Sequence, residues 1–439
     1  MRSRLTVALG RTARLAARMR GGGSGGTAFP GLVMERTDPG FLERTLSRLP
    51  RGVIVVSGTN GKTTTTKMVV QLLREQGLKV FTNRTGSNFV RGVLAALLTE
   101  VDAAGNLDAD IAVLELDEAH AVHFVARVRP RACLLLNVMR DQLDRFGEID
   151  YTASLLHSIA KATSDVVVLN GDDPRLAAPA FLEGVSARVV SFGAGEDLRS
   201  LFLSDDDLRT GLVSPRAPQD DEQAPGPRVT LEAINGQRAT VRIDGTSHEV
   251  DFTIPGVHNL LNACAALGVV LEVLGEEADL PGLLTTLGTV QAAFGRGEVL
   301  TLDGRPVQLS LVKNPAGFRM GLLSAAAQAQ AGEVVVVAIN DEYADGRDMS
   351  WLWDVDFAAL RTNGVAVVTG VRAWDMALRL RYDDVEVTDV EPDLRKAVAL
   401  MRRAATDADR PMRIFTTYTA MLALRSILGE MTDVEEVMS

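Results

Sequence analysis

The sequence is poor in cysteine, with only Cys133 and Cys264 among its 439 residues. Each lies in an apolar segment (ACLLLN and NACAAL), so both are predicted to be buried core thiols. Two such residues supply neither a disulfide framework nor a cysteine metal cluster. The sequence therefore favours a reducing compartment, and we expect a cytoplasmic protein.

Positive charge is also scarce relative to negative charge. The sequence has 57 Asp and Glu against 46 Lys and Arg, a formal net charge of -11. No field of the whole protein would attract a phosphate backbone, which argues against nucleic acid as a partner.

Long apolar runs are missing as well, so no stretch reads as a signal peptide or a membrane span. The N-terminal segment instead interleaves leucine and valine with arginine, which predicts a basic amphipathic helix. We favour a solvated helix that packs on the next domain, and the alternative is peripheral contact with the anionic inner face of the membrane. The arginines are Arg2, Arg4, Arg11, Arg14, Arg18 and Arg20.

What the sequence has in abundance is a repeated strand, loop and helix pattern, which predicts an α/β protein. We expect three parts: a basic helix and Gly-rich linker at 1–50, a central domain at 51–295, and a C-terminal α/β domain at 296–439. An acidic, Pro-rich stretch at 204–228 is predicted to be a mobile insertion. Predicted strands lie at 53–56, 112–116, 132–136 and 166–169 in the central domain, and at 334–339, 365–368, 385–387 and 413–415 in the C-terminal domain. A helix is predicted at 67–76, another from about residue 259, and a hairpin turn at 235–236.

The segment VIVVSGTNGKTTTT at 53–66 predicts a phosphate-binding loop between a buried strand and a helix. Val56 stands where the usual pattern has its first glycine, so the loop is a shortened one. Lys62 would neutralise phosphate oxygens, and the Thr63 hydroxyl would bind Mg²⁺. The alternative is an ordinary glycine-rich turn. The predicted nucleotide-binding residues are Gly58, Thr59, Asn60, Gly61, Lys62, Thr63 and Thr64.

Polar residues follow other predicted strands at the edge where α/β sheets bind ligands. Glu115 could complete the Mg²⁺ shell opposite Thr63, or it could belong to a solvated acidic loop. Asn137 could contact the nucleotide or cap a helix. Asp173, in NGDDP, could contact the ribose or adenine, or form a turn.

Several segments, in this order, resemble the Mur ligases: GTNGKTTTT, VLELDE, NVMRDQLDRFGE, NGDDP and GVHNLLNACAA. The resemblance implies a central P-loop ATPase domain with a parallel sheet, a C-terminal Rossmann-like domain, and ATP and Mg²⁺ as cofactors. It also implies that His258 and Asn259 lie by the nucleotide base and Arg296 at the domain junction. Only a helix and linker precede the loop, so no nucleotide-sugar substrate is expected. Gln142 replaces a metal-binding histidine of typical members, so a second magnesium site does not carry over.

The segments LVKNPAGF at 311–318 and AINDEYADGRDMSWLWDVDF at 338–357 are similar to the MurT-type branch of this family. That branch supplies the ligase subunit of lipid II isoglutaminyl synthases. The resemblance implies a GatD-type glutaminase partner and ATP-dependent amidation, through an acyl phosphate, of the α-carboxylate of D-glutamate in the lipid II stem peptide. Many relatives carry a four-cysteine zinc ribbon; the insertion at 204–228 has no cysteine, so no zinc is expected.

Asp348 has a separate predicted task. Cys-His glutaminases need a carboxylate that orients the imidazole. The resemblance suggests that Asp348 supplies it to the partner subunit, with Asp345 and Asp354 as rivals. The alternative is a solvated acidic loop anchored by Trp351 and Trp353.

Two other functions remain open at the level of sequence. The chain could be another Mur-like ligase that joins a carboxylate to an amine, such as a folylpolyglutamate synthase. It could also be a nucleotide-binding scaffold that only regulates a glutaminase. The DGRDMSWLWD stretch argues against the first, and the intact Lys62, Thr63 and Glu115 argue against the second.

Overall fold

The computed structural model describes residues 2–19, 28–83, 88–140, 149–210, 227–291, 296–328 and 332–431. The chain forms two compact units. Unit 1 comprises Met1–Val138, Ile149–Thr253 and Asn259–Val290, and unit 2 comprises Met139–Glu148, Ile254–His258 and Gln291–Ser439.

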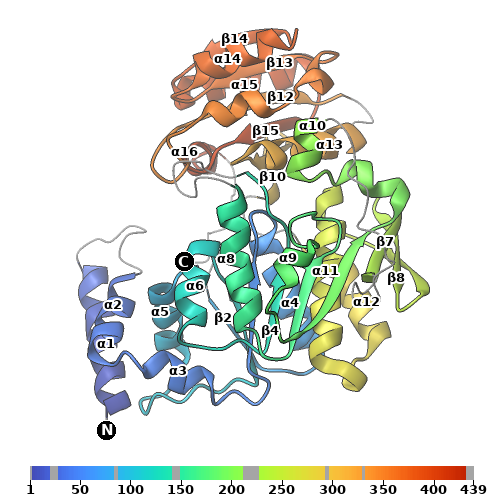
Figure 1. Ribbon diagram of the computed structural model, residues 1–439. Helices are drawn as coiled ribbons and strands as arrows, with labels where there is room; N and C mark the ends of the chain where they lie inside the picture. The colour runs from blue at the N-terminus through green and yellow to red at the C-terminus, as the bar shows by residue number, and fades with distance from the viewer. Residues whose placement is uncertain are drawn as a thin grey trace. The chain divides into compact units, whose positions relative to one another are not determined.

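Unit 1 is built on a nine-stranded sheet in the order β2-β3-β1-β4-β5-β6-β7-β8-β9. Figure 1 labels β2, β4, β7 and β8 of this sheet. The strands from β2 to β7 in this order are parallel, and β8 and β9 continue the sheet as an antiparallel meander. The strands are β1 (Val53–Ser57), β2 (Val80–Thr82), β3 (Ile111–Glu115), β4 (Ala132–Leu135), β5 (Val166–Asn170), β6 (Arg188–Ala194), β7 (Pro227–Asn235), β8 (Arg238–Ile243) and β9 (Thr246–Asp251).

The central strands β1, β3, β4 and β5 are buried along their whole length. Continuous Val, Ile and Leu runs suit strands that helices cover on both faces, which is why these strands could be predicted. The helices of unit 1 are α1 (Arg2–Met19), α2 (Ala28–Thr37), α3 (Phe41–Leu46), α4 (Lys62–Glu75), α5 (Val90–Glu100), α6 (Glu118–Val125), α8 (Ile149–Ala162), α9 (Pro179–Leu182), α10 (Asp205–Thr210), α11 (Val257–Leu274) and α12 (Leu280–Thr289).

Helix α11 is the most apolar of the long helices in this unit. With the turn that follows, Val257–Glu277, it is the one stretch of the described chain that is long and apolar enough to cross a membrane. However, 89% of its apolar window is buried, as in the core helix of a globular unit. Cys264 lies in this helix and Cys133 in β4, and both are free, buried thiols, as predicted.

Unit 2 contains a six-stranded sheet in the order β10-β11-β15-β12-β13-β14. The β10–β11 pair is antiparallel and the other neighbours are parallel. Its strands are β10 (Arg296–Leu302), β11 (Arg305–Leu311), β12 (Val334–Ala338), β13 (Val365–Thr369), β14 (Val387–Glu391) and β15 (Met412–Thr416). Its helices are α13 (Pro315–Gln328), α14 (Ala373–Tyr382), α15 (Leu394–Ala408) and α16 (Tyr418–Gly429). The predicted α/β class with two sheet-based parts is thereby confirmed.

Apart from other shifts of one or two residues at the ends of elements, three details differ from the sequence prediction. Helix α4 begins at Lys62 rather than at residue 67, because Gly61 already occupies its N-cap position. Strand β14 begins at Val387 rather than at 385, since the Val385 amide still bonds Leu380 at the end of α14. The three-part domain division stays a prediction.

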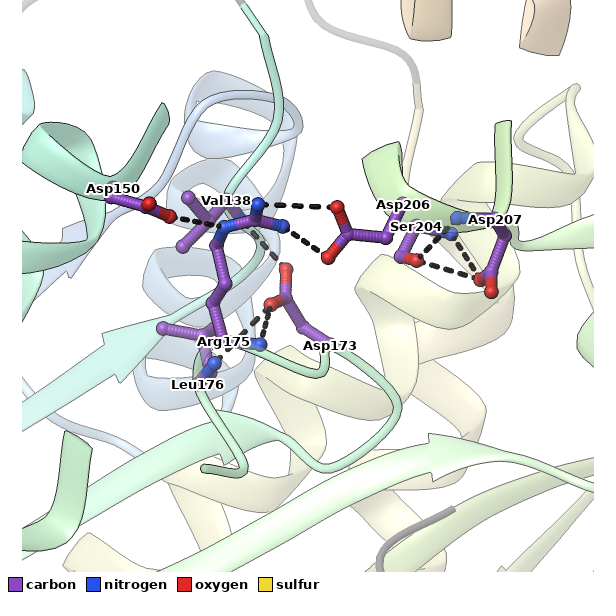
Figure 2. Close-up of polar contacts among 8 residues, drawn as sticks. All are labelled: Val138, Asp150, Asp173, Arg175, Leu176, Ser204, Asp206 and Asp207. Carbon is purple, nitrogen blue, oxygen red and sulfur yellow. Dashed lines mark hydrogen bonds and ion pairs between the residues drawn. The ribbon is translucent and has the colours of Figure 1, made fainter. Parts of the chain in front are cut away.

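The start of the supposedly mobile insertion is the third difference. Ser204 and Asp207 form a reciprocal capping box: the Ser204 amide donates to the Asp207 carboxylate at 2.8 Å, and the Asp207 amide donates to the Ser204 hydroxyl at 3.2 Å. This arrangement starts helix α10, and Figure 2 shows the capping residues. Residues 211–226 of the insertion lie outside the described chain.

Candidate active site

The shortened loop leaves β1 at Gly58 and enters α4 through Gly61. Both glycines have left-handed backbone angles, φ +133° and φ +86°. A Cβ on Gly58 would lie 3.0 Å from the Asn137 amide nitrogen, and one on Gly61 would lie 2.7 Å from Asn262 Oδ1. Only glycine fits both positions without strain. Val56 lies inside β1, paired with Glu115 and Leu134, so the turn begins later than in the longer pattern.

A single asparagine fixes the middle of this loop. The Asn60 amide donates to Asn137 Oδ1 at 2.8 Å, and Asn137 Nδ2 donates to the Asn60 carbonyl at 3.1 Å. The Thr59 amide donates to the Asn137 carbonyl at 3.1 Å. Asn137, a predicted nucleotide contact, therefore holds the loop in shape from the end of β4. Thr59, in the loop, and Thr64, in the first turn of α4, are both buried.

Lys62 is the first residue of α4 and is buried, with 7% of its surface exposed. Its ammonium group donates to the Gly58 carbonyl at 2.5 Å and to Glu118 Oε2 at 3.1 Å. The Glu118 side chain is only 4% exposed, so the two charges form a buried ion pair. Glu118 begins α6, just after β3, and its pairing with Lys62 depends on the adjacency of β1 and β3.

Thr63 and Glu115, the two residues predicted to bind magnesium, are in contact in the structure. The Thr63 hydroxyl donates to Glu115 Oε1 at 2.9 Å. Asn83 holds the backbone of Glu115: its Nδ2 donates to the Glu115 carbonyl at 2.8 Å, and its Oδ1 accepts from the Glu115 amide at 2.9 Å. A hydroxyl and a carboxylate oxygen beside a phosphate-binding loop are the hard ligands that Mg²⁺ prefers, so this pair fits the ion.

Asp173 ties two of the strand-end loops together (Figure 2). Its fully buried carboxylate accepts from the amides of Val138, Arg175 and Leu176 at 2.6, 3.0 and 3.2 Å. Burial raises the pKa of Asp173 to about 6, against the opposing effect of these three amides. The carboxylate thus has an anchoring role, and its contact with a nucleotide stays a prediction.

Arg175, two residues further on, lies between two carboxylates in Figure 2. It pairs with Asp150 at 3.0 Å and with Asp206 at 2.6 Å. Asp206 belongs to α10, so the short helix is attached to the loop that follows β5.

The predicted base-binding residues lie at the start of α11. Asn259 is buried, and its Oδ1 accepts from Asn262 Nδ2 at 3.4 Å. Asn262 is the residue that a Cβ on Gly61 would meet, so the second turn of α11 lies against the phosphate-binding loop. His258 is partly buried one residue before Asn259.

Two further predicted positions lie at the margins of the described chain. Arg296 opens β10 and pairs with Ser310 through its backbone, and its side chain is not among those described. Gln142, like Asp141 and Asp144, lies outside the described residues.

The three candidate aspartates of unit 2 have different surroundings. Asp345 is buried and accepts from the Thr419 amide and hydroxyl at 2.7 and 2.5 Å. Asp354 pairs with Arg140 at 2.9 Å. Asp348 is half-buried, and it accepts from Ser350, whose hydrogen bonds hold the pKa of the Asp348 carboxyl below its usual value. Asp348 is therefore ionised and accessible.

Comparison with known proteins extends this description to the whole chain. Residues 56–270 match the Mur ligase middle domain, and residues 311–421 match the MurT ligase C-terminal domain. The lipid II isoglutaminyl synthase (glutamine-hydrolyzing) subunit MurT of Streptococcus pneumoniae is 28% identical, over 94% of this chain and 95% of that protein. The subunit of the same name from Staphylococcus aureus is 29% identical, over 91% and 92%. The crystal structure of MurF ligase from Thermotoga maritima in complex with ADP has a TM-score of 0.65 at 18% identity, over 90% and 83%.

A shortened phosphate-binding loop beside a Thr–Glu pair lies on the largely parallel sheet of unit 1, and unit 2 is an α/β unit with a sheet of its own. These features, with the family matches, define the class of protein as a P-loop ligase. The chain belongs to the Mur ligase family, and its C-terminal part is of the MurT type.

Proposed function

We propose that this chain is the ligase subunit of a lipid II isoglutaminyl synthase. It would use ATP to convert the α-carboxylate of D-glutamate in the peptidoglycan stem peptide into a carboxamide. The observation that carries the proposal is the similarity to two MurT subunits over more than nine tenths of the chain. The loop geometry at Gly58 to Thr63 supports it, because this reaction needs a phosphoryl donor.

A carboxylate does not react with ammonia at a useful rate, since the leaving group would be oxide. Transfer of a phosphoryl group to one carboxylate oxygen gives an acyl phosphate, which ammonia attacks at the carbonyl as phosphate leaves. The task of the protein is to position the reactants and to offset charge. The start of α4 has no capping side chain, so its first amides suit phosphate oxygens.

Lys62 and the Thr63–Glu115 pair would carry the charge neutralisation. Lys62 would contact the phosphates once these compete with Glu118 for its ammonium group. Thr63 and Glu115 would hold Mg²⁺, which supplies positive charge to the transferring phosphoryl group. Asn83 and Asn137 position these groups through the backbone and contact no reacting atom in this scheme.

The ammonia would come from a GatD-type glutaminase that binds unit 2. Asp348 is the best placed of the three aspartates to orient a partner's catalytic histidine, because it is ionised and half-exposed. Trp353, five residues further along the chain, is exposed and packs edge-on against the exposed Tyr382 of α14 at 5.1 Å between ring centroids. Leu378 and Trp374, one and two turns before Tyr382 on α14, are exposed as well. Large exposed aromatics of this kind suit a protein interface.

Co-expression with a candidate glutaminase, followed by mass spectrometry of the stem peptide, tests the proposal. We expect glutamine- and ATP-dependent replacement of one carboxylate by a carboxamide, with lipid II or an earlier precursor as substrate. Release of ADP only with folate and glutamate would instead identify a folylpolyglutamate synthase. Activation of the glutaminase without any amidation, unchanged in Lys62→Ala, would identify a regulatory scaffold.

A further inference from the structure

The N-terminal helix α1 has one face that is already buried. Val7, Gly10 and Ala13 are buried against neighbouring helices. A Cβ on Gly10 would lie 3.0 Å from Met34 of α2 and 3.0 Å from Leu98 of α5, so the helix is packed closely at this point. Figure 1 shows α1 and α2 side by side at the edge of unit 1. Contacts on this one face therefore hold α1 in place, and its opposite face is not needed for packing.

The other face of α1 is apolar and exposed. With about 100° of rotation per residue, the side chains of this face span roughly 120° of the helix circumference. Leu5 and Leu15 are each 61% exposed and Leu9 is 38% exposed, and Phe29 at the start of α2 is also exposed. A single exposed leucine needs no explanation, but a stripe of them along a docked helix does. The members of the stripe are Leu5, Ala8, Leu9, Thr12, Leu15 and Ala16.

The charged residues of α1 that flank this apolar stripe are all positive. Arg4 and Arg11 are exposed and lie along one edge of the stripe. Arg2 is exposed on the other side, although its guanidinium lies 3.8 Å from Asp38. The first acidic residue of the chain is Glu35, so the segment that includes α1 is wholly basic in a protein with a net charge of -11.

We propose that the exposed face of α1 binds the surface of an anionic phospholipid bilayer. The leucines would enter the boundary between headgroups and acyl chains while the arginines contact lipid phosphates, as in interfacial helices. The positive charge of α1 favours an anionic membrane as the partner, because each arginine near an anionic surface strengthens binding. The acidic remainder of the chain is repelled by such a surface, so α1 would be the part that makes the contact. This inference goes beyond the proposed reaction, and it would hold the ligase peripherally at the inner face of the membrane.

Co-sedimentation of the full-length chain with vesicles that contain no lipid II tests the proposal. We expect binding to vesicles of equal phosphatidylglycerol and phosphatidylcholine, and at least about fivefold weaker binding to phosphatidylcholine alone. Leu5→Glu/Leu15→Glu should lower the partition coefficient at least about tenfold, since two apolar side chains no longer enter the bilayer. Arg4→Glu should lower it about fivefold or more while leaving the leucines in place.

The matched control is Val299→Glu/Leu422→Glu, which makes the same change of charge and polarity at exposed positions of unit 2. This variant should bind vesicles like the unaltered chain. Thermal unfolding and amidation of a soluble stem peptide should be the same for all variants, so that failure of membrane binding is distinguishable from failure of the ligase function. Absence of vesicle binding, or equal binding by the α1 variants, would overturn the proposal. Loss of a dimer in the leucine variant, with vesicle binding unchanged, would overturn it too and assign the face to a second copy of the chain.

Discussion

At the scale of single residues, the Lys62–Glu118 ion pair occupies the ammonium group that we expect to bind the nucleotide phosphates. Both side chains are buried, so each charge depends on the other for compensation. A phosphate that enters the loop would take over the role of Glu118. The pair therefore links the stability of the protein to nucleotide binding.

Glu118→Gln should reveal this link. The variant leaves Lys62 with a weaker partner, so the free energy of unfolding should fall by about 1–3 kcal/mol without nucleotide. The stabilisation produced by saturating ATP should become larger than in the unaltered protein, because the phosphates restore the lost compensation. Thermal unfolding with and without ATP measures both effects.

Glu277→Gln is the control, since Glu277 pairs with Arg51 at an exposed site where the pair contributes little. An ATP-induced stabilisation that is the same in Glu118→Gln and in the unaltered protein would contradict the idea that Glu118 and phosphate compete for Lys62.

Asp173 should give the protein a pH dependence of stability with an unusual sign. Its pKa in the folded state, about 6, lies above the ordinary value of 3.8. The folded carboxyl therefore holds its proton more tightly than the unfolded one, and the stability that this provides below about pH 4 is lost as pH rises to about 6. Relative to Asp173→Asn, the unaltered protein should lose about 2–3 kcal/mol of unfolding free energy across this window. Urea unfolding of both proteins at pH 4.5 and pH 7 gives the difference, and a constant difference would show that the carboxyl does not titrate there.

At the scale of elements, the start of α4 depends on glycine for two separate reasons. Gly61 has φ +86°, and Asn262 of α11 lies where a Cβ would be. Gly77, just beyond the other end of α4, has φ +81° but nothing within 4 Å of a Cβ. Alanine at position 77 would introduce backbone strain alone, whereas alanine at position 61 would introduce both backbone strain and a steric clash with Asn262.

Gly61→Ala should weaken ATP binding at least about tenfold, because both strain and the displaced Asn262 distort the loop. Gly77→Ala should lower the free energy of unfolding by about 1 kcal/mol and leave ATP binding unchanged. Calorimetric titration with ATP and denaturant unfolding of both variants make the comparison. Equal ATP affinities in the two variants would mean that the contact with α11 does not shape the loop.

The elements also explain what the sequence could and could not predict. The buried strands and the contact between Thr63 and Glu115 were predictable, because parallel strands are continuous apolar runs and their carboxyl ends share one edge of the sheet. Asn83 and Glu118 were not, since their contacts follow from the spatial order β2-β3-β1-β4, which differs from the order in the chain. The Ser204–Asp207 capping box could have predicted the start of helix α10, but the acidic composition around it favoured the prediction of a mobile segment.

At the scale of the whole molecule, the proposed chemistry is divided between the two units. The residues that we propose for phosphoryl transfer belong to unit 1, and Asp348, the carboxylate that we propose serves the glutaminase, belongs to unit 2. Substitutions in the two units should therefore abolish different steps.

Lys62→Ala should abolish amidation by the complex while glutamine hydrolysis remains measurable. Asp348→Asn should reduce glutamine hydrolysis by a factor of about 100 or more, because the partner's histidine loses its orienting carboxylate. Amidation in Asp348→Asn should recover when free ammonia is supplied at high concentration. Glutamate release and stem-peptide mass, measured on co-purified complexes, distinguish the two defects. Retained hydrolysis in Asp348→Asn would exclude this role for Asp348.

The asparagines that hold the loop have a consequence for how the enzyme responds to pH. Asn137 fixes the backbone of Asn60, and Asn83 fixes the backbone of Glu115, each through two hydrogen bonds of an uncharged amide. An amide side chain does not titrate in the range where proteins are folded, so these clamps keep their geometry from acid to alkaline conditions. Above the pKa of Asp173, whose carboxylate anchors the neighbouring Val138, the pH profile of nucleotide binding should then report the charges that meet the phosphates, and not a rearrangement of the loop that carries them.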